Sequence, residues 1–191
     1  MPSESLRAEY FERLYAADDD PWSFATSPYE LAKYDDTLSA LGANYAHALE
    51  IGCSVGVLTR RLAARCDDLL AVDVNERALS IARARCAELP HVRFERAGVP
   101  GEFPAGRFDL VVLSEVAYYW SDADLALARE RIARSLEPAG DVLLVHFLPK
   151  VEDYVRDGDA VHASFLADER FEHVHGHRAE RYRLDLLRRS A

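Results

Sequence analysis

The chain has 191 residues and a formal net charge of −10, with 49% hydrophobic and 29% charged residues. This length is enough for one domain with a proper core, and the residue balance is ordinary for a globular protein. The negative charge disfavours a nucleic-acid partner, because phosphate binding needs a basic surface. We expect no membrane association either, since no apolar run approaches the length of a membrane-spanning helix.

The three cysteines, Cys53, Cys66 and Cys86, are odd in number and lack C-x-x-C spacing. This pattern is typical of a reducing compartment and argues against a structural zinc site. The N-terminus lacks the basic and then apolar order of a signal peptide. The sequence therefore predicts a cytoplasmic protein that holds no metal.

The first 41 residues predict a helical cover. One helix is expected over 6–16 and a second over 28–41, where Ser27 is a good N-cap and Pro28 suits the first helical position. Acidic residues and a proline mark the loop between them, which is rich in aromatic residues such as Trp22. These rings either cover the core or form a lid whose ring faces contact a bound cation.

The rest of the chain, 42–191, alternates strands with helices. Strands are predicted over 45–51, 69–74, 92–96, 108–113 and 141–147, and helices over 57–66, 76–88, 122–136 and 158–167. Two late strands, near 171–177 and 181–188, form a terminal antiparallel hairpin. This order predicts an α/β fold with a doubly wound, Rossmann-like, seven-stranded sheet.

A glycine turn follows the first predicted strand, where residues 50–56 read E-I-G-C-S-V-G. Gly52 and Gly56 lack a Cβ, so the turn can be tight and a ligand can approach main-chain N–H groups. Asp73 ends the next strand about twenty residues later, where an acid reaches ribose hydroxyls in this topology. The combination predicts a site for an adenosine-type ligand.

These motifs, together with A-G-V-P at 97–100 and F-D-L-V-V-L-S-E-V at 108–116, resemble the class I S-adenosylmethionine-dependent methyltransferases. Longer stretches resemble the NodS-type N-methyltransferases: D-P-W-S-F-A-T-S-P-Y-E-L-A-K-Y at 20–34, S-E-V-A-Y-Y at 114–119, V-H-F at 145–147 and D-Y-V-R-D-G-D-A-V-H at 153–162. The resemblance implies a single methyltransferase domain over 1–191, with S-adenosyl-L-methionine as cofactor and S-adenosyl-L-homocysteine as product. It implies a small-molecule acceptor, an amine such as an amino sugar or chitooligosaccharide. O-methylation and a non-catalytic cofactor-binding partner remain alternatives.

The resemblance also implies which residues bind the cofactor. They are Trp22, Tyr29, Tyr34, Glu50, Gly52, Cys53, Ser54, Gly56, Asp73, Val74, Gly98, Val99, Ser114, Glu115 and Val116. Similar proteins usually carry an acid at the position of Gly98, which holds the adenine amino group. They also tend to carry Trp and Arg where this chain has Phe147 and Leu148, which points to a different substrate.

An amine acceptor must be neutral before it can attack, so a nearby base helps. His146 and Glu115 are the candidate catalytic residues, because both lie at the C-terminal edge of the sheet, where ligands bind in such folds. Tyr118, Tyr119, His146 and His162 are the candidate substrate-binding residues. In the alternative interpretation, His146 only satisfies a backbone group at a strand end.

Other interpretations of these motifs are weaker. G-C-S-V-G matches the nucleophile turn of α/β-hydrolases, with Ser54, Asp109 and His146 in the right chain order, but Asp109 begins a strand at the wrong edge. A nicotinamide oxidoreductase would need a third glycine in the turn. His173, His175 and His177 alternate along a strand and are expected on one face, where solvation is favoured over a metal site.

Overall fold

The computed structural model describes residues 4–42 and 44–190. Its strands are β1 (Tyr45–Ile51), β2 (Cys66–Asp73), β3 (Val92–Arg96), β4 (Phe108–Ser114), β5 (Leu136–Phe147), β6 (Phe171–Arg178) and β7 (Tyr182–Arg189). Its α-helices are α1 (Ala8–Ala17), α2 (Pro28–Ser39), α3 (Val57–Leu62), α4 (Glu76–Arg85), α5 (Asp122–Ser135) and α6 (Gly158–Leu166). Two 3₁₀ turns, η1 (Ala63–Arg65) and η2 (Ala117–Tyr119), complete the described elements. Within the described ranges, no helix is both long and apolar enough to cross a membrane.

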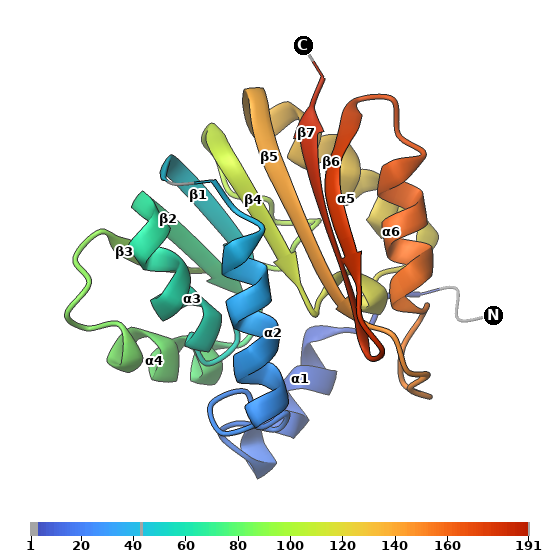
Figure 1. Cartoon of the computed structure of the whole chain (residues 1–191). Helices are drawn as coiled ribbons and strands as arrows, with labels where there is room; N and C mark the ends of the chain where they lie inside the picture. Colours follow the sequence, from blue (N-terminus) through green and yellow to red (C-terminus); the bar gives the residue numbers. More distant parts are fainter. Residues whose placement is uncertain (1–3, 43, 191) are drawn as a thin grey trace.

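The strands form one seven-stranded sheet in the order β3-β2-β1-β4-β5-β7-β6 (Figure 1). Strands β1 to β5 are parallel, and β7 runs antiparallel to both β5 and β6. This arrangement confirms the predicted Rossmann-like fold with its terminal hairpin. The strand order reverses between β1 and β4, and ligands bind beyond the carboxyl ends of the strands at such a point. Helix α1 lies across that end of the sheet (Figure 1).

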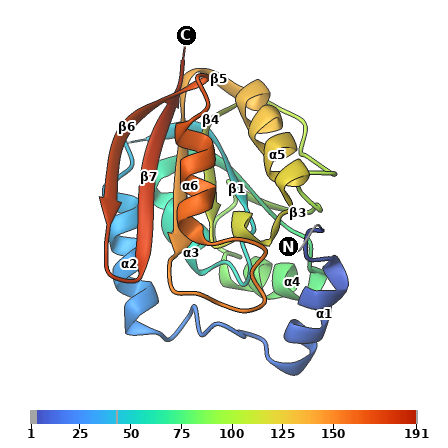
Figure 2. The same ribbon diagram turned by 90° about the vertical axis from the view of Figure 1, so that its right-hand side faces the viewer.

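Helices cover both faces of the sheet, as expected for parallel strands that are apolar on both sides. One face packs Leu49 and Val111 against α5 and α6, whereas the other packs Ala48 and Val112 against α2 and α3. Figure 2 shows α2 and α5 on opposite sides of the strands. The sheet therefore holds the ends of β1, β2 and β4 in fixed positions next to one another.

Some predicted boundaries were wrong. Strand β2 begins at Cys66 rather than 69, because its polar start, Asp67 and Asp68, pairs with the beginning of β1 at the surface. Helix α3 ends at Leu62 and continues as the 3₁₀ turn η1, so the helix predicted over 57–66 is shorter.

Strand β5 also begins earlier than predicted, at Leu136 instead of 141. The stretch Pro138-Ala139-Gly140, which lies between the predicted helix and the predicted strand, forms an irregularity inside β5. Ala139 has a φ of +60° there, and the pairing with β4 shifts register between Phe108 and Leu110. Such bulges insert extra residues without ending the strand, so the alternation of side chains does not reveal them.

Candidate functional site

A cavity of about 770 Å³ lies at the carboxyl end of the parallel strands. Its wall combines α1, the aromatic loop, the glycine turn, the ends of β2 and β4, and η2. This volume is in the range of small-molecule and cofactor sites. The predicted residues on the wall are Trp22, Tyr29, Tyr34, Glu50, Gly52, Cys53, Ser54, Asp73, Val74, Gly98, Val99, Ser114, Glu115, Val116, Tyr118 and Tyr119.

The glycine turn is tight, but most of its N–H groups face the protein. Gly52 has a φ of +79°, and its N–H donates to the Val72 carbonyl at 2.8 Å, as does that of Cys53 at 3.0 Å. A Cβ on Gly52 would lie 3.0 Å from Val116 Cβ, so glycine lets the turn pack against the end of β4. These two N–H groups are therefore not free for a ligand, although the turn was expected to offer main-chain N–H groups to one.

Gly56 is not on the cavity wall, contrary to the predicted cofactor contact. Its φ is +75°, and a Cβ there would lie 2.8 Å from Ala82 Cβ on α4. The absence of a side chain lets the start of α3 approach α4 closely. Gly56 thus shapes the turn by allowing two helices to pack closely.

Asp73 is held rigidly at the end of β2. Its Oδ2 accepts the Ser54 N–H at 2.9 Å, and its Oδ1 accepts the Asn75 N–H at 2.9 Å. Burial raises the pKa of Asp73, and these N–H donors oppose the rise. Each carboxylate oxygen has two lone pairs, so the fixed carboxylate can still accept bonds from hydroxyl groups in the cavity.

Glu50 lies on the same wall and is only 2% exposed. Its Oε2 has no hydrogen-bond partner among the described residues, and burial raises the pKa of Glu50 to about 8. An unsatisfied buried carboxyl oxygen is unfavourable, so a ligand cation or N–H group would stabilise it. This atom is the clearest unfilled hydrogen-bonding position in the cavity.

An acid is present beside Gly98 even though residue 98 itself is glycine. The Glu102 carboxylate accepts the Gly98 N–H at 2.8 Å and lies on the cavity wall near Val74 and Val99. A loop residue four positions later thus supplies a carboxylate to an otherwise apolar part of the wall. The sequence carried no signal for this, because Glu102 lies in a loop without periodicity.

A buried ion-pair network joins α2 to the end of β4. The Lys33 ammonium is 2.6 Å from Glu115 Oε1 and 2.7 Å from Glu30 Oε2, with the Lys33 side chain 1% exposed. Glu115 Oε2 also accepts the Tyr118 hydroxyl at 2.5 Å and the Phe147 N–H at 3.1 Å. Burial alone would lower the pKa of Lys33, but the two carboxylates raise it above its ordinary value. Lys33 is therefore a cation and not a base.

Aromatic rings complete the wall near this network. Tyr118 stacks on Tyr154 with ring centroids 4.0 Å apart, and Tyr119 packs edge-on against both. Tyr29 lies under the Arg181 guanidinium, 4.5 Å from its ring centroid. The sequence pattern does not reveal the contacts of Tyr15, Glu30, Lys33, Tyr154 and Arg181, and its only signal for them is the i, i+3 acid–base spacing on α2.

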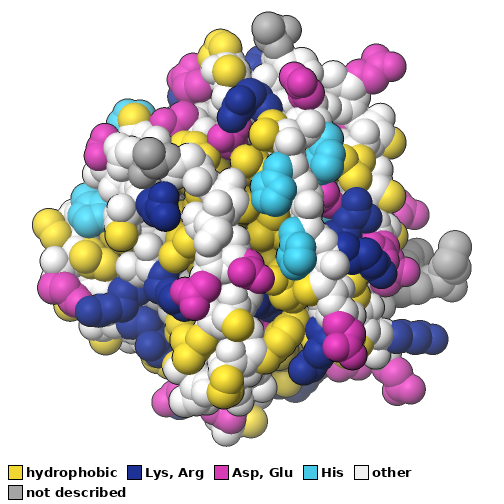
Figure 3. Space-filling model, in the orientation of Figure 1, with side chains coloured by type: hydrophobic (Ala, Val, Ile, Leu, Met, Phe, Trp, Pro, Cys, Tyr) yellow, Lys and Arg dark blue, Asp and Glu magenta, His cyan; other side chains and the backbone are white. Residues whose placement is uncertain are grey.

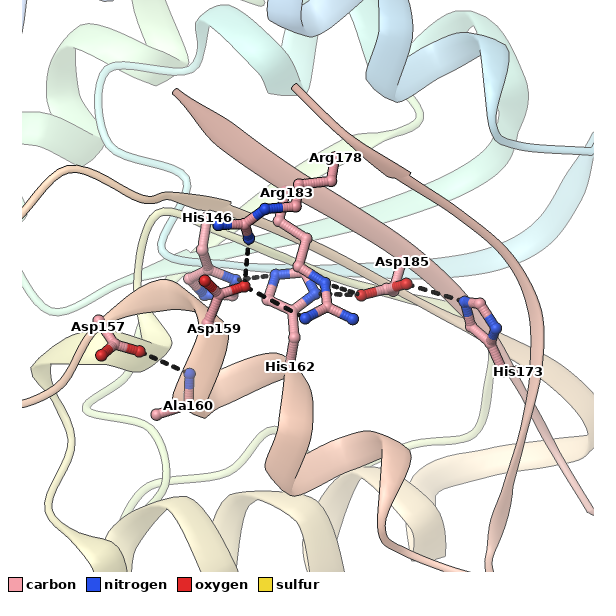
Figure 4. Close-up of polar contacts among 9 residues, drawn as sticks. All are labelled: His146, Asp157, Asp159, Ala160, His162, His173, Arg178, Arg183 and Asp185. Atoms are coloured by element: carbon pink, nitrogen blue, oxygen red, sulfur yellow. Dashed lines mark hydrogen bonds and ion pairs between the residues drawn. The ribbon is translucent and has the colours of Figure 1, made fainter. Parts of the chain in front are cut away.

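His146 and His162 do not lie on the cavity wall. Both side chains are fully buried behind it, with His146 Nδ1 3.2 Å from His162 Nε2 (Figure 4). His146 Nε2 accepts the Ala117 N–H at 3.3 Å, and burial lowers the pKa of both imidazoles. The predicted substrate contacts of His146 and His162, and the role of His146 as a base, do not fit these positions. His146 instead satisfies a backbone group, which was the alternative interpretation.

The hydrolase interpretation is also contradicted. Ser54 Oγ lies 2.6 Å from the Tyr15 hydroxyl. Asp109 accepts the N–H groups of Ala46 and His47 at the opposite end of the sheet. These residues and the buried His146 belong to three separate regions, so no serine triad forms.

The three histidines of β6 do not share a face, contrary to expectation. The pairing of β6 with β7 shifts register between His173 and His175, so one extra residue turns His173 to the other side. In the described part of the chain, no group of three His, Cys, Asp or Glu side chains could hold a metal ion. Figure 3 shows histidine side chains gathered at the surface of this edge.

The family profile described as nodulation protein S (NodS) matches residues 6–157. The nodulation protein S of Rhizobium tropici is 33% identical over 130 residues, 66% of this chain and 55% of that protein. The protein of the same name from Bradyrhizobium diazoefficiens is 36% identical over 116 residues, 60% of this chain and 55% of that protein. The matched region thus spans about half the length of these curated relatives.

Solved structures agree with the sequence comparison. The N-methyltransferase NodS from Bradyrhizobium japonicum WM9, in complex with S-adenosyl-L-homocysteine, superposes with a TM-score of 0.83 at 25% identity. The superposition covers 96% of this chain and 98% of that one. The similarity therefore extends over both the sheet and the helical cover.

Proposed function

Because the chain belongs to the NodS family, we propose that it is an S-adenosyl-L-methionine-dependent methyltransferase that modifies a small-molecule amine. The observation that carries the proposal is the pair of carboxyl groups, Asp73 and Glu50, fixed on one wall of the cavity at the strand-order reversal. Both face a space of suitable size for a nucleoside-sized ligand, about 770 Å³.

The chain's residues fit this cofactor. Asp73 would accept bonds from the ribose hydroxyls, because its N–H partners already hold the carboxylate in place. The unpartnered Oε2 of Glu50 would accept from the ammonium of the methionine part. Val74 and Val99 offer apolar contact to the adenine ring, and Glu102 offers an acceptor to its amino group. When bound, the cofactor supplies an electrophilic methyl group on a sulfonium.

The acceptor end favours an amine. The attacking nitrogen gains positive charge, and carboxylates and aromatic faces stabilise such a cation. Glu115 and Glu30 share one ammonium, that of Lys33, and Tyr118 and Tyr154 lie beside them. We assign Glu115 the role of orienting the acceptor amine and accepting its proton. The cover excludes water, and positioning supplies most of the rate.

Calorimetry with S-adenosyl-L-homocysteine tests the cofactor site. We expect binding by the unmodified chain and at least tenfold weaker binding by Asp73→Ala. Asp67→Ala is the matched control, because Asp67 is exposed at the other end of the same strand. Equal affinity of all three proteins would exclude Asp73 from the cofactor site.

A methyl-transfer assay tests the acceptor. Amino sugars, chitooligosaccharides and simple amines are incubated with S-adenosyl-L-methionine, and the products are mapped by mass spectrometry. We expect a methyl group on nitrogen and at least tenfold slower turnover by Glu115→Gln. Methylation on oxygen would overturn the amine assignment, and cofactor binding without transfer to any acceptor would indicate a non-catalytic binding protein.

A further inference from the structure

A buried series of hydrogen-bonded side chains lies behind the cavity wall, and the proposed chemistry does not use it. Asp185 on β7 bonds to His162 on α6, which bonds to His146 on β5, which bonds to the Ala117 N–H (Figure 4). The distances are 2.6 Å from Asp185 Oδ2 to His162 Nδ1, 3.2 Å between the imidazoles and 3.3 Å to Ala117 N. Each of the three residues is at most 2% exposed.

The two ends of this hydrogen-bonded series, Asp185 and the Ala117 N–H, determine which nitrogen atoms carry protons. Asp185 is an ion-paired acceptor: burial opposes ionisation, but His162, Arg183 and His173 hold the pKa of Asp185 below its usual range. His162 must therefore donate from Nδ1, and because it is neutral its Nε2 is an acceptor. His146 then donates from Nδ1 and accepts with Nε2. The Ala117 N–H, which can only donate, requires the same arrangement from the other end.

The fold makes room for these groups with two glycines. A Cβ on Gly176 would overlap Asp185 Oδ1, and a Cβ on Gly158 would lie 3.0 Å from His146 Cβ. Arg183 Nε, 2.7 Å from Asp185 Oδ2, balances the carboxylate charge, so neither imidazole needs to be protonated. Each nitrogen atom of the two imidazoles therefore has a hydrogen-bond partner in the described structure.

This hydrogen-bonded series ends at the part of the cavity wall that we assign to the acceptor. Ala117 begins η2, whose next residue, Tyr118, donates its hydroxyl to Glu115. If His146 held the other tautomer, its Nε2–H would face the Ala117 N–H, and two donors would repel each other. The hydrogen-bonded series cannot deliver a proton to the cavity, because His146 Nε2 accepts a hydrogen bond from a backbone amide and does not contact a ligand.

We propose that Asp185, His162 and His146 are positioning residues for the acceptor site. Their hydrogen bonds keep both imidazoles in the Nδ1-protonated tautomer and thereby fix the position of η2. Tyr118 and Glu115 are then held where they can contact the bound amine. The kinetic part of this inference rests on the proposed methyl transfer, whereas the tautomers and the hydrogen bond to Ala117 do not.

Three substitutions of His146 separate positioning from filling of space. His146→Gln keeps an acceptor near the Nε2 position, His146→Asn keeps polar atoms only near the Nδ1 position, and His146→Leu removes both. We expect the KM for the acceptor to rise at least tenfold in the Asn and Leu variants and to return to within threefold of the original in the Gln variant. The affinity for S-adenosyl-L-homocysteine is expected to stay within twofold in all three, because Asp73 and Glu50 are elsewhere.

NMR provides a readout that needs no activity. Imidazole ¹⁵N spectra are expected to show His146 and His162 in the Nδ1-protonated form, and exchange of the Ala117 amide is expected to accelerate at least tenfold in His146→Asn but not in His146→Gln. His173→Ala is the control, because His173 contacts the other oxygen of Asp185, at 2.8 Å. An Nε2-protonated His146, or equal behaviour of the Asn and Gln variants, would overturn the inference. Should methyl transfer be absent while the NMR results hold, only the proposed function fails.

Discussion

The Lys33 ammonium lies 2.6 Å from Glu115 Oε1, although 82 residues separate them in the chain. Lys33 comes from the N-terminal cover and Glu115 from the end of β4. Their ion pair fastens the cover to the edge of the sheet where the acceptor is proposed to bind. We therefore expect stability and the proposed acceptor binding to be coupled through this buried contact.

Replacing Lys33 by methionine is expected to destabilise the protein by about 3–5 kcal/mol, because two buried carboxylates lose their shared partner. Urea unfolding followed by circular dichroism measures the loss. Lys150→Met is the matched control, since Lys150 is exposed. A loss below about 1 kcal/mol, typical of a surface pair, would contradict the burial of this network.

Glu50→Gln is expected to stabilise the protein in the absence of cofactor. The pKa of about 8 means that the folded state keeps the carboxyl proton at pH 7, whereas the unfolded chain releases it. The native carboxyl therefore opposes folding by an amount on the order of 3 kcal/mol at that pH, and glutamine removes part of it. We expect a higher Tm with weaker cofactor binding. A lower Tm at pH 8 would contradict the raised pKa.

Glu102→Ala tests whether this carboxylate recognises the adenine amino group. We expect the affinity for S-adenosyl-L-homocysteine to fall about tenfold, corresponding to roughly 1.4 kcal/mol for one hydrogen bond to a charged acceptor. The inosine analogue, which lacks the amino group, should bind equally to both proteins. Glu172→Ala, an exposed residue on β6, is the control. A parallel loss for both ligands would show that Glu102 acts only on the loop.

Gly56→Ala is expected to destabilise the protein more than Gly101→Ala. The φ of +75° disfavours alanine, and the new Cβ would lie 2.8 Å from Ala82 Cβ. A loss of about 2 kcal/mol or more follows from strain and overpacking together. Gly101→Ala, whose nearest neighbour would be at 3.5 Å, is the comparison in the same unfolding experiment. Equal Tm values would mean that α3 and α4 separate easily.

Acidification below pH 6.5 is expected to destabilise the protein through His146. Burial lowers the pKa of His146 well below 6.5. As the pH falls, this imidazole therefore binds a proton in the unfolded chain but stays neutral in the folded chain. This residue therefore reduces stability by up to about 1.4 kcal/mol per pH unit as the pH falls. Glu30, Glu50 and Asp73, whose pKa values are raised, act in the opposite direction. Urea unfolding from pH 7 to 5.5 gives the slope of the free energy of unfolding against pH for the original chain and for His146→Gln. The difference between the two slopes is the His146 contribution, and identical slopes would refute it.

The amino-acid pattern alone determined the wound α/β sheet, its terminal hairpin and the place of the ligand edge. Continuous apolar strands, capped helices and the glycine turn are local features, and their order permits few topologies. The positions of Asp73 and Glu115 followed from the same logic, because each lies at the carboxyl end of a predicted strand. The family resemblance added the cofactor and the acceptor class, which local patterns do not specify.

Only the tertiary structure decided which polar groups face the cavity and which lie behind it. His146 and Glu115 both lie at the carboxyl ends of strands, yet α6 and β7 surround the imidazole while α2 brings Lys33 to the carboxylate. The register shift in β6 separated histidines that the alternation placed together. These outcomes depend on contacts between residues far apart in the chain, where burial and hydrogen-bond partners assign each side chain its role.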